Sequence, residues 1–125
     1  INLHFQREGS KARTQYTIFA MHGFGGGRKT GSKVNRVEDL AQYFDADIYL
    51  MGHTHDLFVT REIRLYASRG KIRERKLIFA NTGTFLRTYN MGNTSYGEMR
   101  AYKPTKIGVV RIDLIPEEKD LHGRE

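Results

Sequence analysis

Two apolar runs and one helical pattern stand out in the hydrophobic and polar positions of the chain. The run at 48–51 is continuous and of strand length, as in a strand that is covered on both faces, and another apolar run spans 16–21. Between them, apolar residues at helical spacing predict a helix that packs on a sheet: Val37, Leu40, Ala41 and Phe44. Asn35 and Glu38 form a capping-box pair, so we expect this helix to begin after Asn35. A right-handed parallel crossover is the connection that this order favours.

Antiparallel strands are predicted on both sides of this unit. Residues 1–6 alternate apolar and polar, a turn at 7–11 follows, and 14–21 returns as the second strand of a hairpin. Residues 57–67 and 71–80 flank a turn signal at 68–70 and predict a second hairpin. We expect a further turn at 82–84, a last strand at 107–115 and a polar tail from Pro116. Without a repeat or a linker, residues 1–125 are predicted to form a single domain of the α+β class, an α/β-type sandwich that is mostly β with one main helix.

The balance of charged residues favours anionic partners. The chain has 21 Lys and Arg against 14 Asp and Glu, a net charge of +7. Such a field attracts nucleic acid or phosphorylated ligands, although it also serves solubility. The basic second hairpin and the Tyr-, Arg- and Lys-containing segment at 89–104 are the candidate nucleic-acid surfaces, and a solvated face and an ordered loop are their alternative readings.

Hydropathy and cysteine content indicate in which compartment of the cell the protein is expected. No apolar run approaches the ~18 residues of a membrane span, so no membrane partner is expected. The chain contains no cysteine, which excludes disulfides and thiolate metal sites. That composition is compatible with a reducing cytoplasm, where we expect the protein to act.

Candidate chemistry gathers where the two apolar runs end. His22 and Gly23 follow the first run, and Gly-His-Thr-His at 52–55 follows the second. Because ligands bind at the carboxyl ends of strands in open α/β sheets, we expect His22, His53 and His55 to lie together there. In an extended segment, His53 and His55 project to the same side. Neutral imidazole binds Zn, Mn, Fe and Co, so the three histidines predict a metal site; hydrogen-bonded histidines without a metal are the alternative.

These motifs resemble the second half of the calcineurin-like metallophosphoesterases. In that family a strand ends in a lone His, a helix follows, and the next strand ends in Gly-His-X-His, as at 21–23 and 52–55 here. Asn-Thr-Gly-Thr at 81–84 is similar to the turn that often follows. The resemblance covers residues 16–85 and implies the C-terminal half of a four-layer sandwich. The Asp-X-His, Gly-Asp-X-X-Asp and Gly-Asn-His motifs of the family's first half are absent from the sequence.

The resemblance implies hydrolysis of phosphodiesters or phosphomonoesters at a dinuclear centre of two divalent ions, which could be Mn, Fe, Zn or Ni. It assigns His22 and His53 to one ion and His55 to the other, with Asp56 and Thr54 as candidates to orient the imidazoles. Because no bridging carboxylate is identified, we expect this chain alone to be inactive. A missing N-terminal half or a partner chain is expected to carry the carboxylate ligands.

The glycine-rich segment at 23–33 is the candidate substrate-binding loop. A nucleotide-hydrolysing P-loop needs Gly-Lys-Ser/Thr, whereas this segment has Gly-Ser-Lys at 31–33. Backbone amides from Gly23 onward, with Arg28 and Lys29, could instead hold a substrate phosphate, or the segment could be a basic loop that serves solubility. Two other functions remain open. One is a non-catalytic nucleic-acid-binding or interaction module, and the other is a mononuclear zinc hydrolase that uses the three histidines.

Overall fold

The described part of the chain combines six strands with one main helix and one short one. The computed structural model describes residues 1–23, 30–87, 89, 91–92 and 104–121, apart from the side chains of 30–32, 118, 120 and 121. The elements in order are β1 (Asn2–Gln6), β2 (Arg13–Met21), α1 (Thr30–Tyr43), β3 (Ile48–Met51), β4 (Leu57–Ser68), β5 (Lys71–Thr84), β6 (Gly108–Val109) and α3 (Pro116–Leu121). The prediction of a mixed fold that is mostly β with one main helix is confirmed. Within the described residues, no helix is long and apolar enough to cross a membrane.

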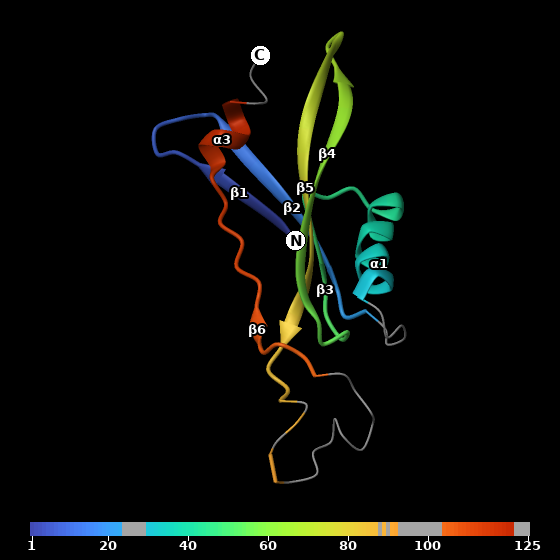
Figure 1. Cartoon of the computed structure of the whole chain (residues 1–125). Coiled ribbons are helices and arrows are strands. Elements are labelled where there is room, and N and C mark those ends of the chain that lie inside the picture. Colours follow the sequence, from blue (N-terminus) through green and yellow to red (C-terminus); the bar gives the residue numbers. More distant parts are fainter. Residues whose placement is uncertain (24–29, 88, 90, 93–103, 122–125) are drawn as a thin grey trace.

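The strands form one sheet in the order β1-β2-β3-β5-β4, with β6 added at the end of β5. The central strands β2, β3 and β5 are parallel, and the two edge strands run antiparallel to their neighbours. The predicted parallel crossover is confirmed, because Ile18–Met21 pairs in register with Ile48–Met51 and α1 connects the two strands. In Figure 1, α1 lies on one side of the sheet and the segment that leads to α3 lies on the other.

The main core lies between α1 and the sheet. Its fully buried members are Val37, Ala46, Tyr49, Met51, Leu77 and Phe79. Tyr49 stacks on Phe79 with ring centroids 4.9 Å apart, and its hydroxyl donates to the Phe44 carbonyl at 2.6 Å. The predicted helix stripe is confirmed, since Leu40 and Ala41 pack against this cluster and the Phe44 ring lies 4.5 Å from that of Phe19.

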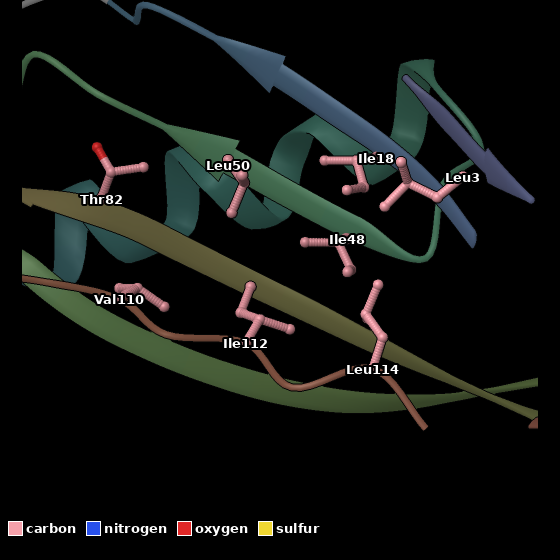
Figure 2. Close-up of a pocket in the computed structure, with 8 residues that line it drawn as sticks. All are labelled: Leu3, Ile18, Ile48, Leu50, Thr82, Val110, Ile112 and Leu114. Carbon is pink, nitrogen blue, oxygen red and sulfur yellow. The ribbon is translucent and has the colours of Figure 1, made fainter. Parts of the chain in front are cut away.

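The opposite face of the sheet carries an apolar pocket of about 310 Å³ (Figure 2). Its lining residues come from β1, β2, β3, β5 and the chain after β6: Leu3, Ile18, Ile48, Leu50, Thr82, Val110, Ile112 and Leu114. The predicted strand at 107–115 is wrong in extent, because the ladder with β5 spans only Gly108 and Val109. The aliphatic side chains at 110, 112 and 114 instead line the pocket on this face of the sheet.

Three other expectations are corrected. The helix begins at Thr30, so Asn35 lies inside it and is not its cap; the added turn carries Lys33, whose buried contacts stabilise it. The turn expected at 82–84 is part of β5, and Gly83 is needed there because a Cβ would lie 2.3 Å from the Gly108 carbonyl oxygen of β6. The tail from Pro116 begins as helix α3, consistent with the preference for proline in the first helical turn.

A buried carboxylate at the start of β3 joins four elements. Asp47 accepts hydrogen bonds from the Thr17 amide at 2.8 Å and from Arg75 Nε at 2.9 Å, and it pairs with Lys119 Nζ at 2.8 Å. Burial raises the pKa of Asp47, but the hydrogen bonds from Lys119, Thr17 and Arg75 outweigh it, so that the pKa is lowered. The ionised carboxylate therefore connects β2, β3, β5 and α3.

Candidate metal site at the ends of β2 and β3

Two histidine rings meet at the carboxyl edge of the parallel strands. Met21 and Met51 are opposite each other at the ends of β2 and β3, and the Gly52 amide donates to the Met21 carbonyl at 3.2 Å. The chain then brings His22 Nε2 to 2.9 Å from His53 Nδ1. One ring nitrogen donates a hydrogen bond to the other, and the tautomers decide which of the two is the donor. The predicted approach of His22 and His53 is confirmed.

The backbone around His53 and His55 is not extended, contrary to our expectation. Both residues have positive φ, +62° for His53 and +55° for His55. A non-glycine residue in this region costs about 1–2 kcal/mol, so surrounding contacts must hold the two histidines in place. Thr54 lies between them and is buried, and its amide donates to the Gly52 carbonyl at 2.7 Å. The His53 and His55 ring centroids are 6.3 Å apart.

A buried polar cluster of Lys33, Thr54, Asp56 and Asn81 lies beneath this turn. Lys33 Nζ of α1 is 2.7 Å from Asp56 Oδ2 and donates to the Thr54 carbonyl at 3.0 Å. Asn81 of β5 is fully buried and donates from Nδ2 to Thr54 Oγ1 at 2.7 Å. The cluster therefore holds both the backbone and the side chain of Thr54, and through Thr54 it fixes the histidines on either side.

The paired nitrogens of His22 and His53 are candidate ligands for one metal ion. Their 2.9 Å separation is that of a hydrogen bond, which a bound ion would replace, and two ligands about 2.0–2.1 Å from a tetrahedral ion lie about 3.3 Å apart. Among the residues that the structure describes, no group of three or more His, Cys, Asp or Glu side chains could hold a metal ion. Among the described residues, His22 and His53 bring two possible ligand nitrogens together, and a metal site there would need further ligands.

The candidate substrate-binding residues Gly23, Arg28 and Lys29, and the two carboxylates that precede β3 in the sequence, occupy other positions. Gly23 follows His22 with a φ of +80°, and a Cβ there would lie 2.7 Å from Met51 Cγ, so close packing against β3 explains this glycine. Arg28 and Lys29 lie outside the described residues. Asp45 and Asp47 precede β3, roughly 13 Å of strand from its histidine end, and both pair with Arg75.

Sequence reasoning missed Lys33 and Asn81 as parts of the site. Lys33 lies four residues before Val37 and extends the buried stripe of α1 by one turn, which is a signal that a buried partner was required. Asn81 follows Phe79 at strand spacing on the face that α1 covers, where an apolar residue would be usual. In both cases the sequence shows a polar residue at a position where an apolar one is expected. The role of each residue becomes clear only from the partner that it contacts in the structure.

Comparisons of the chain with protein-family models, with curated proteins and with solved structures give no match. The geometry of the site therefore carries the functional argument.

Proposed function

We propose that this chain contributes the histidine half of a dinuclear metal centre that hydrolyses phosphate esters. The carboxylate ligands would come from a preceding segment or from a partner chain. The observation that carries the proposal is the 2.9 Å approach of His22 Nε2 to His53 Nδ1 at the carboxyl edge of two parallel strands. His55 follows one buried residue later, on the same turn.

The chemistry divides between the ions and the chain. Two divalent ions, when bound, lower the pKa of a coordinated water and neutralise charge on the phosphate. His22, His53 and His55 would bind through neutral nitrogens, so protons compete with the ions and affinity falls as the pH is lowered. The polar cluster beneath Thr54 holds the rings in position before any ion arrives. The net charge of +7 favours an anionic ester, either a nucleic-acid phosphodiester or a small phosphomonoester.

The proposal extends to the surrounding architecture. We infer that the sheet and α1 form the C-terminal half of a sandwich like that of the calcineurin-like metallophosphoesterases. The sheet face opposite α1 supports this inference, because Ile18, Ile48 and Leu50 line an apolar pocket there (Figure 2). Ile48 is already buried and the aliphatic side chains at 110, 112 and 114 line the same pocket, so a second sheet on that face would have to pack against the segment that carries them. The same packing would bring further ligands to the edge where the histidines lie.

Divalent-ion binding tests the proposal. We expect titration calorimetry of the 125-residue chain with Mn²⁺ or Zn²⁺ to detect binding that His22→Ala and His53→Ala each weaken at least about tenfold, the 1.4 kcal/mol expected for a lost ligand. His4→Ala is the matched control, since His4 is an exposed histidine of β1. Hydrolysis of bis-p-nitrophenyl phosphate should be absent with this chain alone and should appear when the carboxylate half is supplied.

The alternatives give different results. Unchanged ion binding in both site variants would contradict the proposal. No ion binding, with or without the carboxylate half, would favour the nucleic-acid-binding or interaction module. One equivalent of zinc with hydrolysis by this chain alone would favour the mononuclear hydrolase.

A further inference from the structure

The outer edge of β4 is the longest unpaired strand edge in the described part of the chain. β4 is last in the sheet order and pairs with β5 on one side only. Its pairing with β5 runs without a bulge from Leu57↔Thr82 to Ser68↔Lys71, over twelve residues. In Figure 1 this hairpin extends well beyond α1 and β3. Exposed edges of this length pair readily with another strand, and proteins usually prevent this with proline, bulges or short edge strands. β4 has none of these three protections, and its edge carries instead the charged side chains of Arg61, Glu62 and Arg64, which also oppose unspecific pairing.

The side chains of β4 divide into two faces. Val59, Arg61, Ile63 and Leu65 lie on one face. Its apolar members Val59, Ile63 and Leu65 are 48%, 61% and 61% exposed, and Arg61 is exposed as well. Glu62 and Arg64 lie on the other face. The contact of Arg64 with Asp45 is long, 3.9 Å, because Arg75 holds the same carboxylate oxygen at 2.7 Å. The strand therefore offers an exposed face that is apolar except for Arg61, and two opposite charges at neighbouring positions of the other face.

These charges select one partner register. When a strand pairs antiparallel with its own copy, a two-fold axis passes through one residue, and residues at equal distances on either side of it lie opposite each other. An axis through Ile63 places Glu62 opposite Arg64 twice and Ile63 opposite itself. An axis through Glu62 or Arg64 places like charges opposite each other, which is destabilising. An axis through Leu65 forms no ion pair in β4.

We propose that two copies of this chain associate through antiparallel pairing of β4 with β4, with the two-fold axis at Ile63. The sheet then continues across both copies, and the backbone groups of the β4 edge bond to each other. The partner is a second copy because the sequence around Ile63 is complementary to itself in charge, with Glu62 opposite Arg64 twice and Ile63 opposite itself, while Arg61 lies opposite Leu65. This association is independent of the proposed phosphoesterase site, which lies at the ends of β2 and β3.

Cysteine cross-linking tests the axis directly, because the chain has no cysteine of its own. Opposite residues of antiparallel strands have Cα atoms about 4.5–5.5 Å apart, within the range of about 4.4–6.8 Å that a disulfide spans. Ile63→Cys should therefore form a disulfide-linked dimer under mild oxidation. Leu65→Cys is the matched control, since residues 65 of the two copies would be four positions apart along the strand, roughly 13 Å. Cross-linking that is no faster for Ile63→Cys than for Leu65→Cys would overturn the proposal.

Charge reversal provides a second test in solution. Glu62→Arg and Arg64→Glu should each raise the dissociation constant of the dimer about tenfold or more in sedimentation equilibrium, because two attractive pairs become repulsive. An equimolar mixture of the two variants should associate about as tightly as the original chain, since every opposite pair is again of unlike charge. Melting temperatures of the separate variants establish that both are folded. A monomeric original chain at high concentration, or a mixture no tighter than its components, would refute the pairing and leave β4 as an edge for a different chain.

Discussion

Replacing Lys33 by methionine isolates the contribution of the buried ion pair beneath the histidine turn. Methionine keeps most of the aliphatic stem of the side chain and removes its charge. Lys33 and Asp56 are 2.7 Å apart, and each side chain is only 11% exposed. Removing one partner of a buried pair costs about 3–5 kcal/mol, because the remaining charge is left without compensation. The Thr54 carbonyl also loses its donor.

The expected result is a loss of about 3 kcal/mol, the lower end of that range, because water retains some access to the pair. Urea denaturation followed by circular dichroism measures the free energy of unfolding. Lys76→Met is the matched control, since Lys76 is an exposed lysine on β5 and its replacement should change stability by less than about 0.5 kcal/mol.

A double-mutant cycle tests the physical reason for this loss. The double variant Lys33→Met with Asp56→Asn should be less destabilised than the sum of the two single variants, because no charge remains unpaired. Divalent-ion affinity should fall in Lys33→Met and stay unchanged in Lys76→Met, since Lys33 helps to hold the turn that carries His53. A loss below about 1 kcal/mol, or additive single effects, would refute the claim that this pair is tightly coupled.

Two further predictions concern the frame around the site. The pKa of Asp47 is lowered on folding, so its carboxylate stabilises the protein above about pH 4, and this contribution is lost as the pH falls through the lowered value. Asp47→Asn should therefore lower the free energy of unfolding at pH 7, and in urea denaturation that free energy should fall less steeply between about pH 5 and pH 2 than it does in the original chain. An unchanged fall with pH would contradict this. Gly83→Ala should lower the free energy of unfolding by about 3 kcal/mol or more, because φ is +86° and the new Cβ would meet the Gly108 carbonyl oxygen. Gly70→Ala is the control, since Gly70 has a φ of +73° but open space around it, and it should lower this free energy by about 1 kcal/mol in the same assay. Equal losses would show that the contact between β5 and β6 is not tight.

Sequence reasoning predicted the helices and strands whose apolar residues recur at a regular spacing along the chain. The runs before His22 and after Asp47 became parallel neighbours, and the stripe from Val37 became the buried face of α1. The second hairpin follows from its turn, where Arg69 and Gly70 both have positive φ, as a two-residue connection requires.

The errors arose where tertiary contacts decide the outcome. Asn35 has the chemistry of a helix cap, but the contacts of Lys33 with Asp56 and Thr54 stabilise another turn before it. Gly83 was interpreted as a turn residue, whereas it admits the backbone of β6. The left-handed conformation of His53 also has no local signal, because it depends on how Thr54 is held by groups far away in sequence.

The chain between β6 and α3 has a distinctive mode of attachment to the sheet. Its strand ladder with β5 is two residues long, and its aliphatic side chains at 110, 112 and 114 face the pocket. This segment is therefore held on the sheet more by the burial of apolar side chains than by backbone hydrogen bonds, and hydrophobic stabilisation weakens on cooling. Both α1 and this segment are held on the sheet by apolar burial, so cooling weakens both attachments. This segment has only a two-residue ladder to the sheet, so it is expected to detach before α1 does.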